Sequence, residues 1–200
     1  MAGRFLVLEG IDASGTTTQA RTVAQALRDR GETVLETREP TGFPIGREIR
    51  RGLSSGPDAP DAQTLALLFA ADRLDHLRRE IEPALERGET VICDRYVLSS
   101  LAYQSLECPS DWVEAINRRA RPADSTIWLR VPVELAWKRS VARMEAGEAA
   151  AERFDAPPLQ ARLHAAYEAF AQDPERNVAV VDGTQSIEAV TRSILALWAT

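Results

Sequence analysis

The segment Gly10-Ile11-Asp12-Ala13-Ser14-Gly15-Thr16-Thr17 has residue types and spacing that suit the binding of phosphate groups. Gly10 and Gly15 allow a loop in which successive N–H groups and the start of the following helix face an anion. Thr17 stands where a hydroxyl can bind Mg²⁺. Thr16 replaces the lysine that normally precedes this hydroxyl, and a tight turn without a ligand is the alternative. The sequence therefore predicts a phosphate-binding loop, or P-loop, that lacks its ammonium group.

An acid and a base stand together in Asp94-Arg95, directly after the apolar run Val91–Cys93. In open parallel sheets ligands bind at the carboxyl ends of strands, so we expect this pair to face the P-loop. Asp94 could hold Mg²⁺ through water, and Arg95 could bind a phosphate with two parallel hydrogen bonds. The alternative is an acid that caps the next helix and pairs with its neighbour. The nearby P-loop favours the metal and phosphate site.

Two further groups of residues are predicted to reach the same crevice. The turn Arg38-Glu39-Pro40 follows the second apolar run, so its two charged side chains should point towards that edge of the sheet. Phe69 and Arg73 are four residues apart in a helical pattern and therefore share a face. An aromatic ring one turn from a guanidinium can stack a base and donate to its carbonyl. The alternative is a core phenylalanine beside a solvated arginine.

Short apolar runs alternate with longer amphipathic stretches, which predicts strands separated by helices. The expected strands are Phe5–Leu8, Thr33–Leu35, Val91–Cys93, Thr126–Leu129 and Val178–Val181. The clearest helical patterns are Thr17–Arg30, Asp61–Arg87, Pro132–Glu145, Leu159–Gln172 and Ser186–Trp198. This order implies a single α/β domain over residues 1–200, with parallel strands and right-handed crossovers. A stretch rich in Gly, Ala and Glu predicts a short lid at about 144–156.

The composition of the chain indicates which partners it is not expected to bind and in which compartment we expect it. The net charge of −6 and the pI near 5.1 argue against non-specific binding to nucleic acid or to an anionic membrane. Cys93 and Cys108 lie in different kinds of segment, so we expect free thiols and a reducing, cytoplasmic location. His76 and His164 lack metal-ligand spacing and are predicted to lie on helix surfaces.

Five segments taken together resemble bacterial thymidylate kinase. They are Phe5–Gln19, Thr37–Gly42, Leu68–Arg73, Asp94–Gln104 and Val181–Val190. They keep the family's order over nearly the whole chain, and Asp94–Gln104 is the most specific because neighbouring nucleoside monophosphate kinases do not share it. The resemblance implies a five-stranded parallel sheet flanked by helices and a homodimer. It also implies Mg²⁺-dependent phosphoryl transfer from ATP to dTMP, giving ADP and dTDP for dTTP biosynthesis.

The resemblance implies roles for residues around the acceptor phosphate. Arg95 and Arg50 would hold the phosphate of dTMP, with Arg38 nearby. Asp12 would lie between the sugar 3′-hydroxyl and the metal region.

A separate set of residues would recognise the thymine and the sugar. Phe69 would stack the base, and Arg73, Ser100 and Gln104 would contact its polar edge. Tyr103 would crowd the 2′ position of the sugar and so favour deoxyribose. These roles have a physical sense, because a pyrimidine nucleotide needs one aromatic face, a few edge contacts and a charge clamp on its phosphate.

The missing P-loop lysine leaves other cations to neutralise a triphosphate. Our hypothesis is that arginines beside the lid substitute for it. Arg139 and Arg143 share a face of the helix that enters the lid, and Arg153 lies at its far side. Solvated arginines are the alternative. The sequence leaves open whether Arg130 offsets the lost lysine, pairs with an acid or is exposed. The catalytic candidates are Asp12, Arg95, Arg143 and Arg153.

Two other functions remain open on the sequence. A nucleotide-binding homologue that has lost catalysis would account for Thr16, whereas the retained Thr17 and Asp94 favour an enzyme. A kinase for another nucleoside monophosphate would share the sheet and the P-loop, but it would not need the thymine contacts.

Overall fold

The computed structural model describes residues 3–53, 59–147 and 157–199. Five parallel strands form one sheet in the order β2-β3-β1-β4-β5. The strands are β1 (Arg4–Glu9), β2 (Val34–Arg38), β3 (Thr90–Asp94), β4 (Ser125–Arg130) and β5 (Val178–Asp182). The predicted α/β fold with a five-stranded parallel sheet is confirmed.

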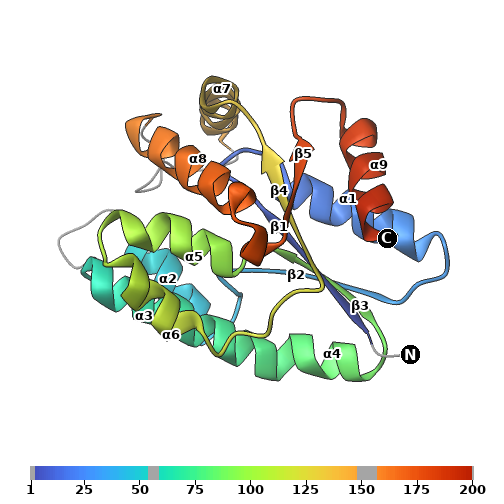
Figure 1. Ribbon diagram of the computed structural model, residues 1–200, viewed down its shortest axis with the longest axis horizontal. Helices are drawn as coiled ribbons and strands as arrows, with labels where there is room; N and C mark the ends of the chain where they lie inside the picture. The colour runs from blue at the N-terminus through green and yellow to red at the C-terminus, as the bar shows by residue number, and fades with distance from the viewer. Residues whose placement is uncertain (1–2, 54–58, 148–156, 200) are drawn as a thin grey trace.

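Helices cover both faces of this sheet (Figure 1). The helices are α1 (Thr16–Arg28), α2 (Pro44–Leu53), α3 (Ala62–His76), α4 (Glu82–Glu86), α5 (Val97–Tyr103), α6 (Ser110–Asn117), α7 (Val133–Glu145), α8 (Pro157–Gln172) and α9 (Ile187–Trp198). In the described ranges, none of them combines the length and the apolarity that crossing a bilayer requires.

Alternating residues of β1 build the core on both sides of the sheet. Leu6 and Leu8 are fully buried in a cluster with residues of α1 and α9. Phe5 and Val7 point to the opposite face and pack against α4 and the turn that precedes it. The hydrophobic run predicted as a buried strand therefore stabilises two helical layers at once, as expected for a strand covered on both faces.

The helical pattern predicted over Asp61–Arg87 is interrupted rather than continuous. Between α3 and α4 the segment Leu77–Ile81 forms a π-helical turn. Pro83 has no N–H group and its ring displaces the carbonyl four residues earlier, so the regular α-helical bonds cannot pass through this point. The turn follows His76 directly and shifts the helix register beside the site described below.

The strand register places the functional loops at one edge of the sheet. In the parallel pairing, Asp94 of β3 lies beside Leu8 of β1 and beside Arg38 of β2. The P-loop after β1 and Arg95 after β3 therefore begin at the same edge, as predicted. One boundary was wrong: β2 runs to Arg38, so this residue ends the strand and only Glu39 and Pro40 belong to the following turn.

Candidate active site

The loop between β1 and α1 makes a tight turn at the carboxyl end of β1. Ser14 N–H donates to Ile11 O at 3.1 Å, and Ala13 and Gly15 have positive φ angles of 58° and 103°. A Cβ atom at Gly10 would lie 2.5 Å from Ser14 Oγ and 3.2 Å from Leu129 O, so a side chain there would force Ser14 to shift. Helix α1 begins at the next residue, and its first N–H groups are free to face an anion.

A hydroxyl and a carboxylate meet beside this loop. Thr17 Oγ1 donates a hydrogen bond to Asp94 Oδ2. Asp94 is buried, and its Oδ1 atom has no hydrogen-bond partner among the described residues. In the same ranges no three His, Cys, Asp or Glu side chains gather into a metal cluster. The pair therefore fits a Mg²⁺ ion that takes few ligands from protein and the rest from phosphates and water.

Arg95 connects this loop to an adjacent pocket. Its φ angle is 70°, a left-handed conformation that costs a non-glycine residue about 1–2 kcal/mol. The strained backbone is held by Arg95 N–H donating to Leu8 O at 2.9 Å. The guanidinium donates to Gly10 O at 2.9 Å and to Asp12 Oδ1 at 2.7 Å. Strain of this kind persists where the surroundings over-determine a functional geometry.

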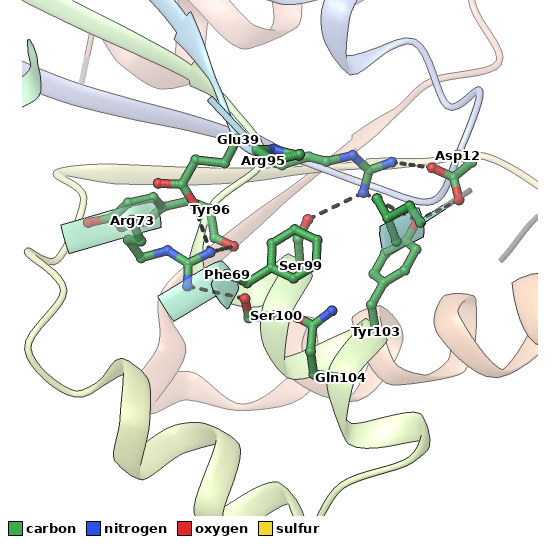
Figure 2. Close-up of a pocket in the computed structure, with 12 residues that line it drawn as sticks. Asp12, Glu39, Phe69, Arg73, Arg95, Tyr96, Ser99, Ser100, Tyr103 and Gln104 are labelled. Carbon is green, nitrogen blue, oxygen red and sulfur yellow. Dashed lines mark hydrogen bonds and ion pairs between the residues drawn. The ribbon is translucent and has the colours of Figure 1, made fainter. Parts of the chain in front are cut away.

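Figure 2 shows the pocket itself, between the β2–α2 turn and helices α3 and α5. It is lined by Asp12, Glu39, Pro40, Leu53, Phe69, Arg73, Arg95, Tyr96, Ser99, Ser100, Tyr103 and Gln104. Most of the predicted substrate-binding residues come together here. The sequence analysis gave no individual role to Leu53, Tyr96 and Ser99. These residues carry no charge, and their spacing matches no motif.

Two predicted phosphate ligands lie outside the set of described residues that line this pocket. Arg50 donates through both terminal nitrogens to the backbone oxygens of Pro40 and Thr41, so it orders the turn that bounds the pocket. Arg38 is exposed at the end of β2. Their predicted contacts with a phosphate stay predictions.

The far end of the pocket contains a buried charge pair. The Arg73 side chain is 2 % exposed, and its Nη2 lies 2.7 Å from Glu39 Oε2. The same guanidinium donates to Ser100 Oγ at 3.1 Å and to Tyr96 O at 2.8 Å. The alternative of a solvated Arg73 is therefore wrong. Phe69 of the same helix also lines the pocket, in agreement with the predicted shared face.

His76 is not the helix-surface residue that its sequence pattern predicted. Its side chain is 0 % exposed and lies between two carboxylates. Nδ1 is 3.2 Å from Glu39 Oε1, and Nε2 is 2.8 Å from Thr37 Oγ1 and 3.2 Å from Glu80 Oε2. The helical pattern gave no sign of these partners because two of them lie on and after β2, far away in the chain.

A buried acid, Glu9, was also missed. It is the last residue of β1 and is 0 % exposed. Its carboxylate accepts hydrogen bonds from Tyr96 N–H at 2.9 Å, Ser99 Oγ at 2.6 Å and Tyr167 Oη at 3.0 Å. Burial raises the pKa of Glu9 above its usual value, although the hydrogen bonds from Ser99 and Tyr167 and the charge of Arg95 oppose the shift. A charged residue closing an apolar strand, directly before the glycine loop, was the available signal.

The arginines of the lid region occupy different environments. Arg139 of α7 reaches the P-loop, with Nη1 3.4 Å from Ser14 O and Nη2 3.3 Å from Gly183 O. Arg143, one turn further along α7, is exposed. Arg153 and most of the predicted lid, residues 148–156, lie outside the described residues.

Arg130 is half-exposed and lies 4.0 Å from Glu168, so it is a surface cation beside an acid.

A glycine loop between β1 and α1, a hydroxyl–carboxylate pair and a pocket at the carboxyl edge of a parallel sheet are consistent with a P-loop kinase domain. The family model described as thymidylate kinase matches residues 8–194. The chain therefore belongs to the thymidylate kinase family.

Individual relatives agree with this assignment. The thymidylate kinase of Thermomicrobium roseum is 42% identical over 203 residues, covering 98% of this chain and 93% of the relative. That of Ruegeria pomeroyi is 38% identical over 200 residues, covering 96% and 92%. That of Bordetella petrii is 39% identical over 202 residues, covering 97% and 94%. The similarity thus spans nearly the full length of each protein.

Proposed function

We propose that the chain carries out its family's reaction, phosphoryl transfer from Mg²⁺-bound ATP to dTMP, with the pocket of Figure 2 as the dTMP site and the P-loop as the ATP site. One observation carries this assignment of sites. The guanidinium of Arg95 lines the pocket and also donates to Gly10 O of the P-loop. An acceptor phosphate bound by Arg95 would therefore be held beside the donor triphosphate.

At the base end, the pocket offers complementary partners for thymine. Phe69 supplies the aromatic face, and Arg73 and Ser100 lie together at the polar edge. Gln104 Oε1 is buried and has no hydrogen-bond partner among the described residues. A ring N–H of thymine would satisfy this acceptor, whose burial alone is unfavourable by about 1–3 kcal/mol.

Tyr103 is proposed to crowd the 2′ position of the sugar. Its hydroxyl donates to Asp12 Oδ2 at 3.0 Å and accepts from Arg95 Nη1 at 3.2 Å. Burial raises the pKa of Tyr103 well above its usual value, so the hydroxyl stays protonated and can keep donating to Asp12. Because both hydrogen bonds fix the Tyr103 hydroxyl, its ring cannot move aside to make room for the 2′-hydroxyl of a ribose.

On the donor side, the P-loop N–H groups would bind the β-phosphate, and Thr17 with Asp94 would bind Mg²⁺. The bound metal would draw charge from the transferring phosphoryl group. Phosphoryl transfer needs in-line placement and neutralisation of spreading charge more than covalent work by the protein. The loop, Asp12 and Arg95 supply that placement from two neighbouring strands.

The charge of the missing lysine is proposed to come from arginines of α7 and the lid. Arg139 is already at the P-loop, whereas Arg143 is exposed and would approach a bound triphosphate. Arg153 lies outside the described residues, and its proposed role rests on the sequence alone. Thr16 is buried and can offer a hydroxyl but no charge. Thr16 is the one feature that favours the rival function, a nucleotide-binding homologue without catalysis.

The assembly is proposed to be a cytoplasmic homodimer. Helix α3 exposes Leu67 and Leu74 by 50% and 42%, with Ala71 between them on the same face. Spacings of four and three residues align these side chains into one apolar stripe. A second copy packed on α3 would bury it.

A coupled assay of ADP formation tests the proposal directly. The acceptors dTMP, dUMP, dCMP and AMP are compared at equal concentration with Mg-ATP. We expect turnover to be fastest with dTMP. Tight binding of thymidine nucleotides without dTDP formation would favour the inactive homologue, and preference for another base would favour a different nucleoside monophosphate kinase.

A further inference from the structure

Several contacts hold the guanidinium of Arg73 in one orientation, and some of them come from residues that do not line the pocket. Nη1 donates to Ser100 Oγ and to Asn117 Oδ1. Nη2 donates to Tyr96 O and lies 2.7 Å from Glu39 Oε2. Each terminal nitrogen carries two protons, and the three hydrogen bonds direct three of these four protons. The contact with Glu39 Oε2 is an ion pair without hydrogen-bond geometry, so one Nη2 proton is left to donate to a ligand. A guanidinium held in this way cannot rotate without breaking charge-assisted bonds.

Asn117 fixes one side of this guanidinium from outside the pocket. It is the last residue of α6, is 5% exposed, and is 44 residues from Arg73 in the chain. Its Nδ2 donates to Val113 O at 2.8 Å. Because arginine can only donate, Oδ1 must face Arg73, and the bond to Val113 locks the amide in that orientation.

His76 fixes the other side through Glu39. The Glu39 carboxylate is 3 % exposed, with one oxygen near Arg73 Nη2 and the other near His76 Nδ1. On its opposite side the imidazole is held by Thr37 and Glu80. The fully buried imidazole of His76 therefore fixes the orientation of the Glu39 carboxylate that pairs with Arg73.

We propose that Asn117 and His76 are positioning residues that set the discrimination between pyrimidine bases, Asn117 through Arg73 and His76 through Glu39. The inference rests on the proposed role of Arg73 at the polar edge of the base. Thymine and uracil present a carbonyl at C4, whereas cytosine presents an amino group. A fixed guanidinium, which only donates, favours the carbonyl and opposes the amino group. A guanidinium free to turn loses that selectivity.

The first test compares Asn117→Leu with Asn117→Asp. Leucine has a similar volume but no acceptor, whereas aspartate keeps the acceptor for Arg73 and loses the bond to Val113. Steady-state kcat/KM is measured for dTMP, dUMP and dCMP. For Asn117→Leu we expect kcat/KM to fall about tenfold for both dTMP and dUMP and to change little for dCMP, in line with the loss of one charge-assisted bond. For Asn117→Asp we expect the ratio of dTMP to dCMP to be retained.

Val113→Ala is the matched control. Val113 lies on the same helix, is 0% exposed and is absent from the contacts of Arg73. Its truncation destabilises α6 without removing an acceptor. We expect a lower Tm and an unchanged dTMP to dCMP ratio, so a general loss of stability is separated from a loss of positioning.

The second test compares His76→Phe with His76→Gln. Phenylalanine fills the space without a donor, whereas the glutamine amide can still donate to Glu39. We expect the dTMP to dCMP ratio to fall in the first variant and to recover largely in the second. If Asn117→Leu and His76→Phe both lowered kcat/KM equally for dTMP, dUMP and dCMP, the inference would be overturned. A wild-type enzyme that fails to distinguish dTMP from dCMP would instead overturn the proposed role of Arg73, and the inference with it.

Discussion

Arg95 and Asp12 form an ion pair of 2.7 Å between Nη2 and Oδ1, although 83 residues separate them in the chain. Arg95 follows β3 and Asp12 belongs to the loop after β1, and these strands pair directly in the sheet. Both side chains line the same pocket. The residue proposed to hold the acceptor phosphate is therefore fixed relative to the loop proposed to hold the donor.

Arg95→Lys should disable the acceptor site. A lysine cannot donate to Gly10 O and Asp12 together while also offering two parallel bonds to a phosphate. Loss of two charge-assisted bonds corresponds to a fall of about 100-fold or more in kcat/KM for dTMP. Steady-state kinetics measures this. Arg121→Lys, at an exposed pair with Glu82, serves as the control and should leave kcat/KM unchanged. Near wild-type activity of Arg95→Lys would exclude the proposed role.

Thr16→Lys tests whether other cations already supply the missing charge. If they do, kcat should change by less than about tenfold, whereas an arginine newly delivered to a transferring phosphoryl group is worth about 10³–10⁵ in rate. Arg139→Ala should lower kcat more in the natural background than in the Thr16→Lys background. A rise in kcat of several orders of magnitude for Thr16→Lys would show that nothing compensates for the lysine.

Glu9→Gln should remove a pH dependence of stability. Burial raises the folded-state pKa of Glu9 above 4.5, so the folded state binds this proton more tightly than the unfolded state. The contribution of Glu9 is fully favourable below pH 4.5 and is lost as the pH rises through the folded-state pKa. The side chain introduced by Glu9→Gln does not titrate, so the free energy of unfolding of this variant should rise relative to that of the wild type across that window. Urea unfolding from pH 4.5 to about 8 measures it, and parallel curves would count against the buried acid.

Leu74→Arg should break the proposed dimer. The side chain is 42% exposed on α3, so an arginine costs the monomer little but places a charge within the apolar stripe. Sedimentation velocity should show a dimer for the wild type and a monomer for the variant. A matched change on another exposed helix position, Ala196→Arg of α9, should leave the dimer intact. A wild-type monomer would refute the proposed assembly.

The sheet and the edge that binds ligands could be predicted from sequence, because both depend on local patterns. Apolar runs gave the five strands, and the spacing of Gly10 and Gly15 gave the loop. Parallel pairing then required the segments after β1 and β3 to meet. The π-helical turn at Leu77–Ile81 was not predicted, although Pro83 just after it was a sequence signal for a break in the helix.

The supports of the site could not be predicted from periodicity, because their partners are distant in the chain. Tyr167 lies within a predicted helix and Asn117 lies outside the clearest helical patterns. Neither residue stands out in the sequence, and only the fold brings them to Glu9 and Arg73. His76 was assigned to a surface for the same reason. Residue type and spacing identify groups that can do chemistry, whereas burial and long-range contacts identify the groups that hold them in place.

We propose that backbone N–H groups, Mg²⁺ and arginines bind and activate a triphosphate here without a lysine in the P-loop. The most direct test is turnover of dTMP by the purified wild-type protein with Mg-ATP, followed by chromatographic detection of dTDP. We expect stoichiometric formation of dTDP and ADP, and we expect EDTA to abolish it because the reaction is proposed to need Mg²⁺. Binding of dTMP and ATP without formation of dTDP would contradict it.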